Sequence, residues 1–184
     1  MSQNTIYRPN VLIGMACKRM EPYRFSQEEA AKVGMRPEDT GVIILIIVYL
    51  IDRSKKKGEK VCRSKLEYYL LLLDRKCFKE RGVLLFTWTL KKNGRIHNFK
   101  KFTEFMVNKG LIISNGSAYF ELTKVGDGLG TYFAEIPIIA RWLDDFIARW
   151  ASDTAKNMEA EVIAAKNDQK YQDALNNVRN LLSI

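Results

Sequence analysis

Apolar positions recur at helical spacing along most of the chain, and the first such run is apolar on every side. Residues 38–53 contain the ten-residue stretch VIILIIVYLI. Pro37, Glu38 and Asp39 favour a helix start just before it, since proline suits the first turn and acids suit the positive end of the helix dipole. A helix that is apolar all round is buried, and a membrane span needs roughly 20 apolar residues. We expect a core helix and no membrane span, followed by a solvated basic loop at 53–60.

A second helix and a strand are expected next. The second helix covers residues 62–79 and stops at Arg81-Gly82, because glycine is the usual residue just past a helix end. Its apolar residues recur three and four apart: Leu66, Tyr69, Leu70, Leu73 and Phe78. The segment 82–94, GVLLFTWTLKKNG, is rich in residues that favour strands and ends on an Asn-Gly turn signal, so it predicts a strand.

The segment 98–126, NFKKFTEFMVNKGLIISNGSAYFELTKVG, carries the most information. It predicts a short helix from Ile96 or Asn98, a strand at 111–114, a turn at Asn115-Gly116 and a strand at 118–122. Thr123 is a candidate N-cap for a following helix, although glycines at 126, 128 and 130 weaken that helix. A helix, a β-hairpin and another helix in this order are typical of the recognition helix and wing of a winged helix-turn-helix domain.

The two ends of the chain add helices. Residues 1–37 hold three of the four prolines, and Ser26 to Glu29 suit the start of a short helix. This arm packs either on the domain or on a partner. Residues 135–150 form a clear apolar stripe, in which Trp142, Phe146 and Trp150 favour packing on the chain's own core over a partner contact. A last helix at about 152–182 has a thin apolar face, which is typical of coiled coils or subunit packing.

These patterns together predict a mainly helical α+β protein. Residues 1–37 form an N-terminal arm, and residues 38–133 form a winged helix-turn-helix core. Residues 134–184 form a C-terminal helical extension whose last helices are candidates for a homodimer contact.

A family resemblance points the same way. Lys65-Leu66 with Leu70 to Leu73, Phe86-Thr-Trp88, the segment 105–112 (FMVNKGLI) and the segment 119–126 (YFELTKVG) resemble the small winged-helix proteins called YwgA-like or SocA-like. That grouping includes antitoxins and phage-associated proteins. The resemblance covers about a third of the chain and implies DNA binding or antitoxin-like partner binding. It supplies no catalytic residues.

Charge adds a partner class to this picture. The net charge is +9, yet residues 52–109 alone carry 17 Lys/Arg against 6 Asp/Glu, a net charge of +11. Such a concentration attracts phosphate, an acidic protein surface or anionic lipid. Lysine and arginine neutralise phosphates, while polar side chains of a recognition helix read base edges. The candidate nucleic-acid contacts are Lys55, Lys56, Lys57, Lys91, Lys92, Arg95, His97, Asn98, Lys100, Lys101, Thr103, Lys109, Asn115 and Ser117.

Other chemistry finds little support in the sequence. The three cysteines lie far apart and the chain has one histidine, which argues against a disulfide framework and a metal site and fits a reducing compartment. No nucleophile stands at a motif spacing from His97. Gly126 to Gly130 follows a hairpin strand, which is the wrong context for a dinucleotide loop. We expect no catalytic residues, no metal and no cofactor.

The leading hypothesis is therefore a cytoplasmic DNA-binding winged-helix protein, a transcriptional regulator or a related DNA-associated factor. The alternative is a non-catalytic protein-interaction module, antitoxin-like or an accessory subunit, whose basic domain meets an acidic protein partner.

Overall fold

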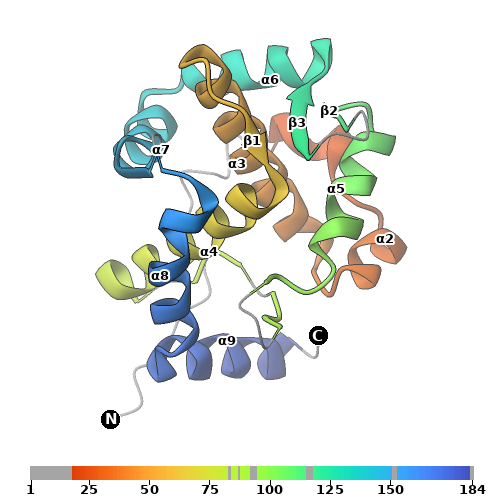
Figure 1. Cartoon of the computed structure of the whole chain (residues 1–184). Helices are drawn as coiled ribbons and strands as arrows, with labels where there is room; N and C mark the ends of the chain where they lie inside the picture. The colour runs from red at the N-terminus through yellow and green to blue at the C-terminus, as the bar shows by residue number, and fades with distance from the viewer. Residues whose placement is uncertain are drawn as a thin grey trace.

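A computed structural model describes residues 18–82, 84–86, 88–91, 95–114, 118–150 and 153–182 (Figure 1). Most of these residues are helical, and the described strands form one small antiparallel sheet, so the expected mainly helical α+β class is confirmed. The helices are η1 (Glu21–Tyr23), α2 (Gln27–Lys32), α3 (Pro37–Lys56), α4 (Arg63–Arg81), α5 (Phe99–Asn108), α6 (Lys124–Ala134), α7 (Pro137–Trp150), α8 (Ala155–Lys166) and α9 (Gln169–Leu182). The strands are β1 (Val61–Cys62), β2 (Ile112–Ile113) and β3 (Tyr119–Leu122).

Helix α3 is the buried centre of the fold, as the apolar run predicts. Every residue from Asp39 to Asp52 is buried, and α3 packs mainly along α6. None of the described helices is both long and apolar enough to cross a membrane. The helix also continues to Lys56, so residues 53–56 are its last turn and the expected loop there is wrong. Arg53 stabilises this turn by donating from Nε to the Tyr49 hydroxyl at 3.1 Å.

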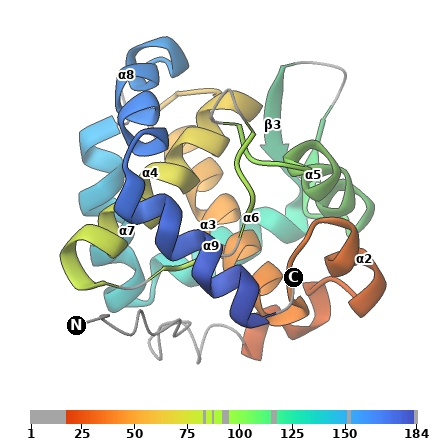
Figure 2. The same ribbon diagram turned by 90° about the horizontal axis from the view of Figure 1, so that it is seen from below.

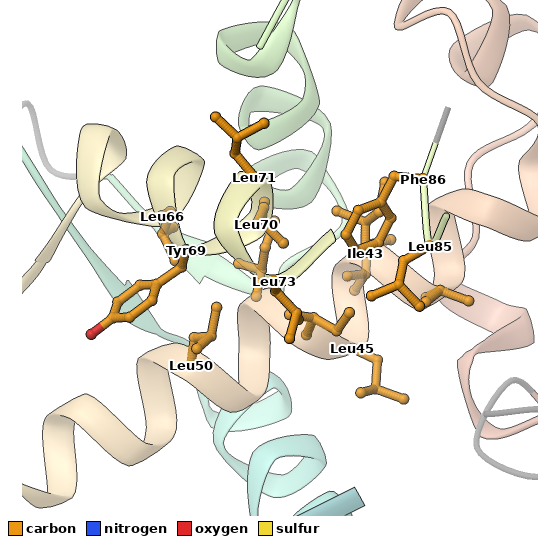
Figure 3. Close-up of a cluster of buried hydrophobic side chains, with 14 of the residues drawn as sticks. Ile43, Leu45, Leu50, Leu66, Tyr69, Leu70, Leu71, Leu73, Leu85 and Phe86 are labelled. Carbon is orange, nitrogen blue, oxygen red and sulfur yellow. The ribbon is translucent and has the colours of Figure 1, made fainter. Parts of the chain in front are cut away.

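Helix α4 supplies the second layer of the core. Leu66, Leu70 and Leu73 are fully buried, and Figure 3 shows them in one cluster with side chains of α3 and with Leu85 and Phe86. The helix ends at Gly82 with φ 65°, a left-handed conformation that glycine adopts without steric cost.

The prediction of a strand at 82–94 is wrong for the described residues of that segment. Leu84, Phe86 and Trp88 are buried, but the only bridge among the described residues outside the named strands pairs Leu90 with Ile96. The amide N–H groups of Leu85 and Phe86 donate to Oδ1 of Asp74 on α4, at 2.6 and 3.3 Å. A side chain of α4 therefore takes the donors that a strand would give to a neighbouring strand.

The predicted last helix is two helices, because the chain turns at Asn167 and Asp168. Oδ1 of Asp168 accepts from the Tyr171 amide at the start of α9, and Oδ2 lies 3.1 Å from Nε of Arg75 on α4. Helix α9 crosses the underside of the molecule (Figure 2). The apolar stripe of α8 and α9 is buried in the chain's own core: Met158, Val162, Ala165, Tyr171, Ala174, Leu175 and Val178. Ile163 and Leu181 remain exposed on these helices, and the expected homodimer contact stays a prediction.

The third predicted helix and the two strands after it are confirmed as α5, β2 and β3. The turn expected at Asn115-Gly116 lies outside the described residues. The sheet order is β1-β3-β2, and both pairings are antiparallel. Strand β1 was not anticipated from the sequence. The Thr123 hydroxyl accepts from the Gly126 amide at 3.1 Å, which confirms the expected cap of α6.

The described part of the N-terminal arm packs on the rest of the chain. Met20, Phe25, Ala30, Val33 and Met35 are buried in the same core cluster as α3. Ser26 and Glu29 form a reciprocal capping box that starts α2. Phe146 and Trp150 of α7 are also buried in this cluster, as the sequence favoured, and Trp142 packs against it.

Two glycines of α6 permit its close approach to neighbouring backbone. A Cβ atom at Gly126 would lie 2.2 Å from the Leu111 carbonyl oxygen, and one at Gly130 would lie 2.8 Å from Cβ of Asp52. A Cβ atom at Gly128 would meet no atom within 4 Å. Residues 126–130 are thus a packing surface within a helix.

We expect Gly126→Ala to lower the free energy of unfolding by about 1–3 kcal/mol or more, because the added methyl group overlaps a backbone oxygen. Gly128→Ala is the matched control and should raise the free energy of unfolding by about 0.5–1 kcal/mol, since alanine is the better helix former. Urea unfolding of both variants measures the difference. Equal effects at the two positions would contradict the packing argument.

The buried Asp74 carboxyl makes the stability of the fold depend on pH. Burial raises its pKa from 3.8 to about 7, against the opposing effect of the donors from Tyr171, Leu85 and Phe86. The folded protein therefore holds a proton that the unfolded chain has released above pH 4. Stability from this group is complete below about pH 4 and is lost as the pH rises to about 7.

Asp74→Asn keeps an acceptor for the two amides and removes the titration, so it should flatten this decline. The slope removed is at most about 1.4 kcal/mol per pH unit. Urea unfolding between pH 4.5 and 8 measures it. Asp145→Asn, an exposed site on α7, is the control and should leave the slope unchanged, whereas an unchanged slope in Asp74→Asn would refute the assignment.

Candidate functional site

A basic groove of about 610 Å³ lies where the first turns of α4 and α5 meet the residues before α5. Five cations line it together with two carboxylates. The lining residues are Arg63, Glu67, Lys91, Arg95, Ile96, Asn98, Phe99, Lys100, Lys101 and Glu104. Five of the sequence-predicted contacts are thus brought together: Lys91, Arg95, Asn98, Lys100 and Lys101.

An ion pair between Arg95 and Glu67 forms the floor of this groove. The guanidinium donates to both carboxylate oxygens of Glu67, from Nε at 2.7 Å and from Nη2 at 2.6 Å, and to the Ser64 hydroxyl at 2.8 Å. The Ile96 amide donates to the same carboxylate at 3.1 Å. Glu67 is 4 % exposed, and its hydrogen bond raises the pKa of the Arg95 guanidinium above its ordinary value. Three of the five guanidinium N–H groups of Arg95 are thus engaged with α4.

Arg63 is the groove cation that sequence reasoning missed. It opens α4, and its guanidinium carbon lies 5.7 Å from the centre of the Phe120 ring on β3. Its Nε is buried without a hydrogen-bond partner in the part of the chain that the structure describes. No sequence spacing links position 63 to positions 91–104, so only the tertiary structure reveals this residue as part of the site.

The first turn of α5 presents Lys100 and Lys101 to solvent. Lys100 is 74 % exposed, and its Nζ lies 3.9 Å from Glu104. Asn98 is differently engaged, since its side-chain amide donates to the Lys32 carbonyl of α2 at 3.1 Å. Thr103 is 1 % exposed and lies on the inner face of the helix, where its hydroxyl donates to the Lys100 carbonyl. It is therefore not positioned to touch a ligand.

The other predicted residues lie outside the groove. Lys55 and Lys56 end α3, and Lys57 is the C-cap residue after it. Lys55 lies 3.4 Å from Asp127 of α6, and Lys56 lies 2.9 Å from Asp52. Nζ of Lys109 pairs with Glu29 of α2 at 3.2 Å. His97 is exposed beside the groove, and its backbone amide donates to the Thr89 carbonyl. Lys92, Asn115 and Ser117 lie outside the described residues.

The groove is lined mainly by charged side chains. Its cationic donors suit the binding of an anion, although Glu67 and Glu104 also line it. Within the described ranges, no group of three or more His, Cys, Asp or Glu side chains is placed to hold a metal ion. Comparison of the chain with protein-family models, curated proteins and solved structures finds no significant match.

Glu67→Ala should lower the free energy of unfolding by about 2 kcal/mol, because it removes the acceptor of both Arg95 and the Ile96 amide. The Arg95 side chain is 30 % exposed, so water recovers part of the loss. Thermal and urea unfolding measure the change. Glu104→Ala, an exposed acid on the rim, is the matched control and should change stability by less than about 0.5 kcal/mol.

Proposed function

We propose that this protein binds double-stranded DNA through a winged-helix unit, with α5 in the major groove and the basic groove against the phosphate backbone. The observation that carries the proposal is the gathering of Arg63, Lys91, Lys100 and Lys101 from separate segments around the exposed start of α5. The mechanism is binding, not turnover.

The order of elements supports a winged-helix unit. The chain runs α3, β1, α4, α5, β2 and β3, and its small sheet has the order β1-β3-β2. Helix α5 leads directly into the β2–β3 hairpin and packs against β2. A helix placed this way leaves one face free beside a hairpin, which is the arrangement that winged-helix proteins use on DNA.

The dimensions and charges also suit a duplex. An α-helix fits the major groove of B-DNA, which is about 12 Å wide. Helix α5 buries Phe99, Phe102 and Met106 against the core, so its polar face is directed outward. Lysine and arginine beside a bound helix neutralise phosphates and release counterions. The positively charged side chains therefore lie beside α5, the helix that would enter the major groove of DNA.

The rival proposal is a protein-interaction module that uses the same surface. Three apolar side chains beside α5 favour it, because a protein partner would cover them: Val107 is 38 % exposed, Ile113 37 % and Tyr119 43 %. A phosphate-binding surface loses affinity steeply with salt, whereas apolar contacts do not. The salt dependence of binding therefore separates the two proposals.

The double variant Lys100→Ala, Lys101→Ala should weaken binding to a 24-base-pair duplex by roughly tenfold at about 0.1 M salt. It should also reduce the slope of log K against log salt by up to about 2, one unit for each lost phosphate contact. Fluorescence anisotropy with labelled duplex, repeated over a salt series, measures both quantities. The melting temperature should stay constant because both side chains are exposed.

The control is Lys156→Ala with Lys170→Ala, which removes the same charge from exposed sites on α8 and α9. It should change the affinity and the slope little. If the two double variants weaken binding equally, the net charge and not this surface attracts DNA. If the wild-type protein retains no duplex but holds a stoichiometric polypeptide after nuclease treatment, the rival proposal is correct.

A further inference from the structure

The outward face of α5 carries polar side chains that phosphate binding alone does not use. Lys101, Glu104 and Asn108 follow one another at spacings of three and four residues, so they form one exposed row along the helix. Lys101 and Glu104 also line the basic groove. The row is thus continuous with the surface proposed to hold the DNA backbone.

Glu104 is an acid on the rim of the basic groove. Its side chain is 56 % exposed, and its ion pair with Lys100 is long, at 3.9 Å. A carboxylate in this place repels phosphate and weakens any contact that depends on charge alone. It favours binding only where it accepts a hydrogen bond from a base, and the cytosine N4 amino group is the donor that the major groove offers to a carboxylate.

Asn108 ends the row with an amide side chain. It is exposed, and it makes no side-chain hydrogen bond with the part of the chain that the structure describes. An asparagine amide pairs with adenine through two hydrogen bonds: its oxygen accepts from the adenine N6 amino group, and its nitrogen donates to N7. Its donor and acceptor are both available for that contact.

The length of the row fits a short base sequence. Seven residues separate Lys101 from Asn108, which is roughly 10 Å along a helix. Base pairs are stacked about 3.4 Å apart, so the row covers about three base-pair steps. Glu104 and Asn108 are about 6 Å apart along the axis, which is about two steps.

Resting on the proposed function, we propose that Glu104 and Asn108 make the binding sequence-selective: Glu104 selects a cytosine and Asn108 an adenine within about three base pairs of it. The lysines and Arg63 hold the backbone and confer no base preference. The Glu104 carboxylate then lowers the affinity for unrelated sequences. At the preferred sequence, its hydrogen bond with cytosine offsets the repulsion from the phosphates.

The experiment is an in-vitro selection with the full-length chain and a random-sequence duplex library, followed by anisotropy on the enriched duplex and on a scrambled one. The wild-type protein should enrich a motif that contains the cytosine and the adenine. Its affinity for that duplex should exceed its affinity for the scrambled one by about tenfold or more, which is the discrimination that one or two good base contacts provide.

Variants assign the two bases. Glu104→Gln should lose the cytosine preference while its affinity for the scrambled duplex increases, because a negative charge is gone. Asn108→Ala should lose the adenine preference alone. The matched control is Glu159→Gln, the same change at an exposed site on α8, and it should retain the complete motif.

The outcomes separate this inference from the function on which it rests. Saturable duplex binding with no enriched motif, or with a motif that Glu104→Gln and Asn108→Ala leave intact, overturns the base assignment and leaves DNA binding standing. Absence of duplex binding by the wild-type protein overturns both. Circular dichroism melting of each variant excludes unfolding as the cause of a lost preference.

Discussion

Two buried carboxylates on α4 hold the segment that connects this helix to α5. Asp74 accepts the amides of Leu85 and Phe86, and Glu67 accepts the Ile96 amide and the Arg95 guanidinium. The two acids are seven residues apart, so they lie on the same face of the helix, two turns from each other. Together they hold both ends of the segment between α4 and α5. The amides of Leu85, Phe86 and Ile96 therefore need no partner from a neighbouring strand, and Leu84, Phe86 and Trp88 lie buried outside the named strands.

Glu67 and Asp74 lie in different electrostatic surroundings. Glu67 lies beside the Arg95 guanidinium and accepts two hydrogen bonds from it. Asp74 is fully buried, and its other oxygen accepts from the Tyr171 hydroxyl of α9 at 2.5 Å. Burial raises the pKa of Asp74 to about 7, so the interior holds it close to neutrality and limits the cost of an isolated buried charge. The same contact attaches α9 to the centre of the fold.

How much of this structure the sequence predicts depends on whether a feature is local. Helical spacing predicts α3, α4, α5 and α7 with small errors at their ends, and the caps at Ser26 and Thr123 follow from residues three positions apart. The failures come from distant contacts. Asp74 replaces a strand partner for residues 85 and 86, Arg75 and Asp168 stabilise the turn that divides the last helix, and Arg63 joins the basic groove from the start of α4. None of these partners is near in sequence, so no periodicity indicates them.

The candidate site was also only partly predictable from the sequence. The sequence locates a concentration of cations, but it cannot say which of them are already engaged. Lys109 is bound to Glu29, Arg95 to Glu67 and Lys56 to Asp52, so these cations serve the fold. The cations left at the surface around α5 are fewer than the net charge suggests, and an exposed carboxylate stands among them. A surface optimised for non-specific attraction would exclude that acid. Its presence beside an exposed asparagine is better explained by discrimination between partners than by attraction alone.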